Sequence, residues 1–225
     1  MRRRWIIAVA VIGLLALVAG APSAFRHVGF FRVRQVELVG VRYLSPDSVL
    51  AALALRPDQN VFDDLTAIAR RAEKLAGVVS ARVERKLPGT LRISIIEQVP
   101  VAFAPGPQKL VALDGDGHPL PYDPAATGLD LPLINRVDTL LARTLSIVRL
   151  ADSALFQDVD GARRNSRGGV TLELGNRHVL LTGIPLPEEI RAVGAVRRHL
   201  STTGRRYEEL DARFEGWVVV RRMAT

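Results

Sequence analysis

The stretch that most constrains the fold is Val78–Pro100, which reads as two alternating segments joined by a tight turn. In the first segment Ala81 and Val83 alternate with charged residues, and apolar residues alternate with polar ones again after the turn. Alternation with period two indicates a strand with one buried and one solvent-facing side. Because Pro88 and Gly89 separate the two segments, the stretch predicts a β-hairpin.

A short strand and two amphipathic helices are predicted before this hairpin. The strand covers residues 34–40 and ends at a glycine. Ser45 and Pro46 are typical of the start of a helix, and residues 63–76 carry apolar side chains at helical spacing. The order strand, helix, helix, strand, strand over residues 31–97 therefore predicts a small α+β domain.

The second half of the chain predicts a mainly antiparallel β-domain with helices. Two helices are expected, one with its apolar residues over 137–148 and one over Pro187–Leu200. The expected strands are Lys109–Leu113, Phe156–Asp160, Gly169–Leu174, His178–Thr182, Glu209–Arg213 and Trp217–Arg222. The segment Asp114–Gly117 is expected to be a turn, because a calcium loop would need a glutamate where Ala125 stands.

An uncharged stretch near the N-terminus, residues 5–25, predicts a transmembrane helix. A bilayer core of about 30 Å is crossed by about 20 apolar helical residues. Arg2–Arg4 form the denser positive cluster, which places residues 1–4 in the cytoplasm and the rest of the chain outside. The alternative is a cleaved signal peptide, since Ala19–Ala21 resembles a cleavage site, but the apolar run is long and Pro22 would follow the cut.

Composition argues against several functional classes. The 225 residues include no cysteine, which excludes disulfides and cysteine-based catalysis or metal binding. The formal net charge is +8, which suits an anionic membrane surface or nucleic acid, but the basic residues are scattered and lack interleaved aromatics. We therefore expect a solvated basic surface and no nucleic-acid partner.

Residues that could carry chemistry form no recognisable constellation. His27, His118, His178 and His199 lie far apart and match no metal-binding spacing. The chain has no nucleophile elbow and no phosphate-binding loop. We expect no enzymatic activity, no cofactor, no metal and no small-molecule substrate.

Several motifs together resemble the POTRA domain in its FtsQ/DivIB version. The first half supplies Val36–Gly40, Asn60–Asp63, the alternating Val78–Arg85, and Glu97 followed by Val99-Pro100-Val101-Ala102. The second half resembles the β-domain that follows POTRA in this family, through Leu113-Asp114-x-x-Gly117, Leu131–Ile134, Gly175-x-x-x-Val179-x-Leu181 and Leu210-Asp211-x-Arg213-Phe214. The expected domains are a POTRA domain over 31–100 and a β-domain over 101–222.

This resemblance implies a non-enzymatic, single-pass inner-membrane scaffold of the bacterial division machinery, located at the septum. In the family the β-domain binds the FtsB–FtsL pair, and FtsK and FtsW or FtsI are further candidate partners. Two other classes remain open: an envelope export or assembly factor that contains POTRA, and an anchored envelope enzyme. The first would need more repeats or a barrel, and the second a catalytic site within residues 102–222.

The expected binding surface is the last strand, over 216–222, where a partner strand can add to a free sheet edge. The residues expected to contact the partner are Arg213, Phe214, Gly216, Trp217, Val219 and Arg221, with the two arginines attracting an acidic segment. The alternative is that the apolar members of this set pack the core of the β-domain. The POTRA domain is the second expected docking surface, through Val36–Gly40 or Val78–Arg85 at its free edge.

Overall fold

The computed structural model describes Trp5 and residues 29–222, which fall into two compact units divided between Glu97 and Gln98. Each unit has its own hydrophobic core. The predicted transmembrane helix over 5–25 and the tail over 1–4 lie outside the described residues, apart from Trp5. In the part that is described, no helix has the length and apolarity needed to cross a bilayer.

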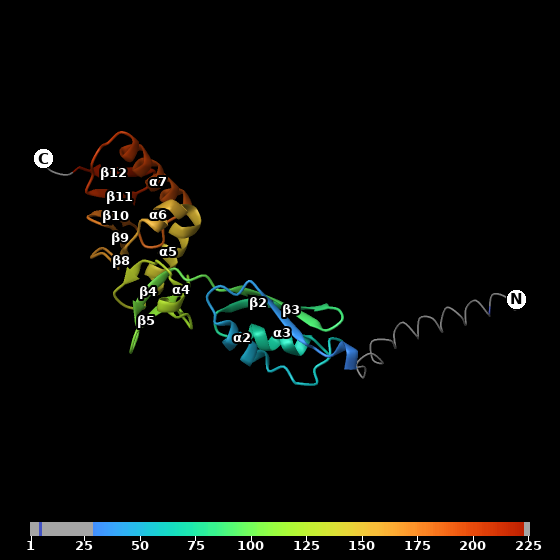
Figure 1. The fold of residues 1–225 in the computed structure, drawn as a ribbon. Helices are drawn as coiled ribbons and strands as arrows, with labels where there is room; N and C mark the ends of the chain where they lie inside the picture. The colour runs from blue at the N-terminus through green and yellow to red at the C-terminus, as the bar shows by residue number, and fades with distance from the viewer. Residues whose placement is uncertain (1–4, 6–28, 223–225) are drawn as a thin grey trace. The chain divides into compact units, whose positions relative to one another are not determined.

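The first unit contains a three-stranded sheet with two helices on one face (Figure 1). Its strand order is β1-β3-β2, with β1 parallel and β2 antiparallel to the central β3. The elements are η1 (Gly29–Phe31), β1 (Gln35–Val39), α2 (Pro46–Leu53), α3 (Thr66–Glu73), β2 (Val78–Lys86) and β3 (Thr90–Glu97). The predicted order of strands and helices is confirmed, and both β1 and β2 lie at sheet edges.

The core of the first unit forms where the central strand meets the helices. Leu91, Ile93 and Ile95 of β3 are buried on one face, as the alternation predicts. Val49 of α2 and Ile68 of α3 are buried in the same cluster. A β-sheet covered on one face by amphipathic helices therefore accounts for the sequence pattern of residues 31–97.

Glu97, at the end of β3, fastens the loop after β1. Its carboxylate accepts hydrogen bonds from the backbone N–H groups of Arg42 (2.9 Å), Tyr43 (2.8 Å) and Leu44 (2.9 Å). The side chain is buried, so these three bonds replace its lost hydration. This glutamate therefore has a structural role in the motif that carried the family resemblance.

The second unit is built on one nine-stranded sheet in the order β12-β11-β10-β9-β8-β7-β4-β5-β6. Five of its eight strand pairings are antiparallel, which confirms the mainly antiparallel prediction. The strands are β4 (Ala102–Pro105), β5 (Leu110–Leu113), β6 (Pro119–Leu120), β7 (Leu133–Ile134), β8 (Gly161–Arg164), β9 (Val170–Leu174), β10 (Arg177–Leu181), β11 (Glu209–Phe214) and β12 (Trp217–Arg221).

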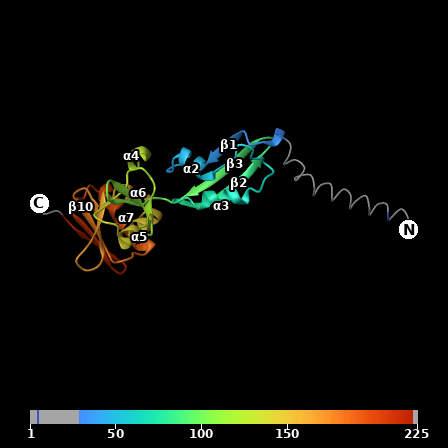
Figure 2. The same cartoon turned by 90° about the horizontal axis from the view of Figure 1, so that it is seen from below.

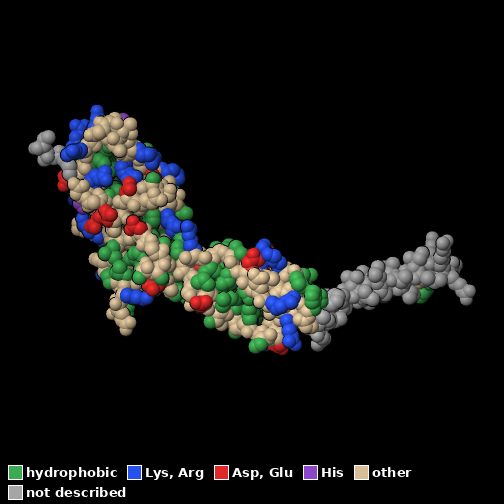
Figure 3. Space-filling view, in the orientation of Figure 1, with side chains coloured by type: hydrophobic (Ala, Val, Ile, Leu, Met, Phe, Trp, Pro, Cys, Tyr) green, Lys and Arg blue, Asp and Glu red, His purple; other side chains and the backbone are tan. Residues whose placement is uncertain are grey.

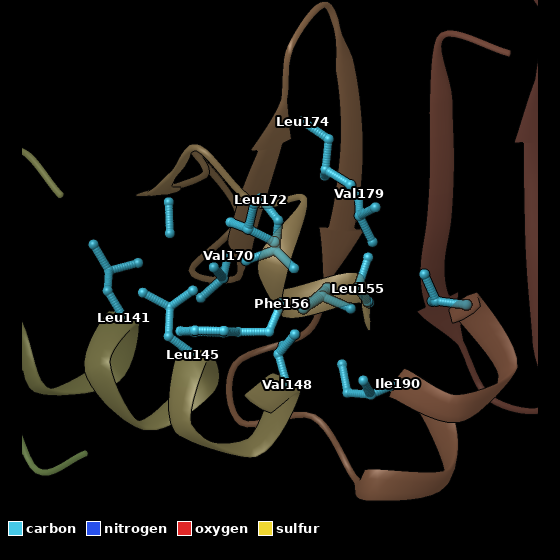
Figure 4. Close-up of a cluster of buried hydrophobic side chains, with 14 of the residues drawn as sticks. Leu141, Leu145, Val148, Leu155, Phe156, Val170, Leu172, Leu174, Val179 and Ile190 are labelled. Atoms are coloured by element: carbon cyan, nitrogen blue, oxygen red, sulfur yellow. The ribbon is translucent and has the colours of Figure 1, made fainter. Parts of the chain in front are cut away.

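Helices cover one side of this sheet (Figure 2). They are α4 (Pro124–Thr127), α5 (Thr139–Ala151), α6 (Ser153–Gln157) and α7 (Pro187–Thr202). Leu145 of α5, Phe156 of α6 and Ile190 of α7 point toward Leu172 and Val179 of the sheet (Figure 4). The core of the second unit thus lies between the sheet and α5–α7.

One predicted strand is wrong. Residues 153–157 form helix α6, and the next strand, β8, begins only at Gly161. The Asp152 carboxylate accepts a hydrogen bond from the Leu155 N–H (2.9 Å) and so caps α6. The apolar residues of this stretch, Leu155, Phe156 and Val159, are buried, but the first two belong to helix α6 and Val159 follows its end.

The turn expected at Asp114–Gly117 is confirmed.

Asp138 connects helix α5 to strand β8. Its carboxylate caps α5 by accepting from the N–H groups of Leu140 (2.9 Å) and Leu141 (3.3 Å). The same carboxylate accepts two bonds from Arg164 of β8, at 2.6 and 2.9 Å. The Arg164 guanidinium holds the pKa of Asp138 below its usual range, and the two backbone N–H donors act in the same direction.

Candidate functional site

The free edge of the nine-stranded sheet is the candidate functional site. Strand β12 pairs with β11 on one side, and within residues 29–222 no strand pairs with its other side. A strand in this position presents unpaired backbone N–H and C=O groups to which another chain can add. The opposite edge is β6, which is only two residues long.

Side chains of β12 alternate between the core and solvent. Val218 and Val220 pack against the core of the second unit. Trp217 is 75% exposed and Val219 is 50% exposed. Phe214 lies opposite Trp217 across the hairpin and is 53% exposed. The edge therefore offers two neighbouring aromatic side chains that the core of this unit leaves largely open to solvent.

Gly216 shapes the hairpin that carries these aromatics. Its φ of 73° lies in the left-handed region, which glycine adopts without steric cost. A Cβ at this position would meet no atom within 4 Å, so the turn is open on that side. The structure thus gives Gly216 a conformational role in the turn, in addition to the expected contact.

The two arginines expected at this edge are both paired within the chain. Arg213 donates to the two carboxylate oxygens of Asp211 at 2.8 and 2.5 Å, and this bond holds the pKa of Asp211 below its usual range. Arg221 lies 3.7 Å from a carboxylate oxygen of Glu209, and its side chain is mostly exposed. Arg221 is therefore the arginine more accessible to an acidic partner. The pairing of Arg213 with Asp211 was not foreseen, although the two residues are separated by only one position.

A groove of about 260 Å³ lies beside the hairpin and extends the site beyond the predicted residues. Glu188, Glu189 and Ala192 of α7 line it together with Phe214, Trp217 and Val218. The Glu189 carboxylate accepts a hydrogen bond from the Leu186 N–H (2.9 Å), which leaves Glu188 as the more exposed acid. The sequence indicated only that this glutamate pair starts a helix, because the hairpin that lies beside it comes about 25 residues later.

The described residues also show what surrounds the remaining candidate groups. None of their His, Asp and Glu side chains cluster in threes or more in an arrangement that could hold a metal ion. His118 lies 3.3 Å from the Asp114 carboxylate within the predicted turn. His178 stands at the start of β10 and His199 near the end of α7. The histidines of the described part thus lie in separate elements.

Comparison with protein families assigns the first unit. Residues 31–98 match the model of the POTRA domain, FtsQ-type. This region comprises the three-stranded sheet and the two helices that cover it. The first unit is therefore similar to the FtsQ-type POTRA domain, and it is joined to a second unit built on a nine-stranded sheet.

Curated relatives extend the similarity to the second unit. Cell division protein FtsQ of Mycobacteroides abscessus is 28% identical over 205 residues, which cover 88% of this chain and 65% of that protein. FtsQ of Mycobacterium tuberculosis is 28% identical over 189 residues, covering 77% and 59%. FtsQ of Mycolicibacterium smegmatis is 33% identical over 121 residues, covering 53% and 36%. The chain is thus related to the FtsQ cell division proteins, and it spans less than two thirds of the length of these three.

Proposed function

We propose that this chain is a non-enzymatic, membrane-anchored scaffold of the bacterial division machinery. The support is the FtsQ-type POTRA domain and the similarity to several proteins named cell division protein FtsQ. The uncharged stretch over 5–25 supports anchoring in the inner membrane, with both described units outside the cytoplasm. In this role the protein gathers other division proteins at the septum and transforms no substrate.

The observation that carries the proposal is the unpaired edge at β12. A partner segment that adds as a strand beside β12 completes hydrogen bonds that are otherwise made to water. Each such bond contributes about 1 kcal/mol net, so these backbone hydrogen bonds fix the register of the partner strand more than they add to its affinity. The partner we propose is the FtsB–FtsL pair, with FtsK and FtsW or FtsI as further divisome contacts.

The aromatic pair beside the edge supplies the affinity. Covering an exposed tryptophan removes up to about 200 Å² of apolar surface from water, which stabilises a complex by roughly 3 kcal/mol or more before entropy losses. Trp217 and Phe214 stand together at the groove, so one apolar side chain of the partner can contact both. Arg221 at the end of β12 and Glu188 of α7, which lines the groove with Trp217, supply opposite charges that set the direction of the added strand.

The test is a binding measurement on the purified full chain in detergent, titrated with the FtsB–FtsL pair. The double variant F214A/W217A should bind at least tenfold more weakly, because it removes both aromatic anchors. The matched control is L150A, which truncates an apolar residue of α5 that is 86% exposed and distant in sequence from the hairpin. Equal affinity of wild type and double variant, with unchanged thermal unfolding, would contradict the proposed docking edge.

The divisional role is tested separately in cells. A fluorescent fusion at the cytoplasmic N-terminus should form a band at midcell in dividing cells. The F214A/W217A variant should still reach midcell but fail to retain the FtsB–FtsL pair. An even distribution around the envelope, in cells that divide normally without the protein, would remove the scaffold proposal.

A further inference from the structure

The first unit carries a mixed apolar and basic surface at the end where the chain enters it. We call this surface the basic tip and define it by Phe30, Arg32, Arg34 and Leu87. Phe30 is 60% exposed and Leu87 is 59% exposed, and both arginines are exposed. Phe30 belongs to η1, and Leu87 lies in the turn between β2 and β3, at the same end of the unit (Figure 1).

Hydrogen bonds hold the two segments of the basic tip together. The Arg34 N–H donates to the Gly89 carbonyl (2.8 Å), which joins the segment before β1 to the β2–β3 turn. On the other side, Val33 donates to the Gln59 carbonyl (2.8 Å). A Cβ at Gly89 would lie 2.7 Å from the Arg32 carbonyl oxygen, so this close approach requires glycine. The tip is thus a fixed surface.

The positive charges of the basic tip are available to a partner. Arg34 donates to the Phe30 carbonyl (3.2 Å), and its guanidinium carbon lies 5.7 Å from the centre of the Phe30 ring. Neither Arg32 nor Arg34 forms an ion pair with any residue that the structure describes. Two acids of the adjoining loop, Asp58 and Asp63, pair with Arg56.

Basic and apolar side chains also lie next to each other on the visible face of this end of the unit (Figure 3). This combination differs from an ordinary solvated surface, where large apolar side chains occur singly. Exposed aromatic and aliphatic groups beside arginines are typical of surfaces that contact the boundary between lipid headgroups and acyl chains.

The position of the basic tip along the chain indicates which partner it meets. The uncharged stretch ends at Phe25, five residues before Phe30. Five residues span at most about 18 Å even when fully extended. If residues 5–25 cross the bilayer, as proposed above, Phe30 stays within reach of the headgroups, because the headgroup layer adds about 5–8 Å to each side of the hydrocarbon core.

We propose that the basic tip docks on the anionic phospholipid surface from which the chain emerges. Arg32 and Arg34 pair with lipid phosphates, and Phe30 and Leu87 insert at the level of the headgroups. This contact holds the POTRA domain against the bilayer in a fixed orientation and adds a second attachment to the membrane anchor. This inference rests on the membrane anchor proposed above. The experiment distinguishes failure of the anchor from failure of the basic tip to dock.

The absence of cysteine allows one environment-sensitive dye to be placed at one chosen position. The full chain with Leu87→Cys, labelled with nitrobenzoxadiazole, is reconstituted into nanodiscs that contain phosphatidylglycerol and a spin-labelled quencher lipid. The matched control is Val79→Cys, because Val79 is 60% exposed on β2, the strand that leads into the β2–β3 turn, but lies roughly 25 Å away from Leu87 along it. The charge variant R32E/R34E in the Leu87→Cys background tests the role of the arginines.

The expected result is strong quenching at position 87, little at position 79, and a severalfold loss of quenching in R32E/R34E or in discs of phosphatidylcholine alone. A chain that stays in the disc without quenching at position 87 would contradict docking of the basic tip on lipid, while the proposed membrane anchor would still hold. Equal quenching at positions 79 and 87 would also contradict this docking, because the contact is then not confined to the tip. A chain that does not enter the disc would contradict both the proposed membrane anchor and the docking of the basic tip.

Discussion

At the scale of single residues, the buried carboxylate of Glu97 is a structural group that sequence patterns do not reveal. The motif around it carried the family resemblance, but its bonds to the N–H groups of residues 42–44 depend on a contact across more than 50 positions. The same is true of Asp138 and Arg164, which are 26 residues apart. Local patterns predict which side of a strand is buried, whereas these pairings are set by the tertiary fold.

Glu97→Gln should lower the free energy of unfolding of the first unit by about 2–3 kcal/mol. The neutral amide offers one acceptor oxygen where the carboxylate offers two, so it leaves buried N–H groups without a partner. Denaturant unfolding of the full chain in detergent measures the effect, with the exposed Glu84→Gln as control. Equal stability of the two variants would contradict the structural role of Glu97.

The pH dependence of stability should include a contribution from Asp138. Its pKa is depressed in the folded protein, chiefly by the Arg164 guanidinium, relative to an unfolded value of about 3.9. The stabilisation is therefore fully present above the unfolded pKa and is lost as pH falls through the folded pKa. Asp138→Asn should lower the free energy of unfolding by about 2 kcal/mol at neutral pH. The difference in unfolding free energy between wild type and variant should shrink below about pH 4. Asp130→Asn, at an exposed position, is the control, and a gap that stays constant with pH would contradict the account.

At the scale of elements, the sequence predicts those strands whose pattern is strictly alternating. The hairpin of β2 and β3 is found where the alternation placed it, and β12 is found at the apolar run Trp217–Val220. The stretch Phe156–Asp160 was predicted as a strand, but so short a segment does not distinguish a strand from a helical turn. A capping aspartate was the local signal that could have identified α6.

The groove beside β12 could not be predicted from the sequence for a different reason. It is assembled from α7 and from the β11–β12 hairpin, and β11 pairs in parallel with β10 through the connection that contains α7. Such a crossover is defined only when the whole sheet forms. The six predicted contact residues therefore covered the hairpin but omitted the α7 side of the groove.

The two faces of β12 provide a matched pair of substitutions. Val218→Asp places a charge against the core and should lower the free energy of unfolding by about 2 kcal/mol or more. Val219→Asp lies on the exposed face and should leave stability within about 0.5 kcal/mol of wild type while weakening binding to the FtsB–FtsL pair. Thermal unfolding and titration of both variants measure this, and the reverse pattern of destabilisation would show that the faces are assigned incorrectly.

At the scale of the whole molecule, two units with separate cores support a division of roles. The POTRA unit has edges at β1 and β2, which remain candidate surfaces for other division proteins. The second unit has β12 as its long free edge, with the groove beside it. The order of the motifs led us to expect a POTRA domain followed by a β-domain, whereas the single nine-stranded sheet depends on parallel pairings between segments far apart in sequence.

The most direct test of strand addition at β12 is hydrogen–deuterium exchange of the full chain with and without the FtsB–FtsL pair. Added strands protect the backbone amides that point away from β11, so protection should be concentrated in residues 217–221. Amides of β2, an edge strand of the three-stranded sheet in the first unit, serve as the internal reference. Protection at β12 that is absent at β2 is the predicted result. A saturated complex in which the exchange of residues 217–221 is unchanged would contradict the account.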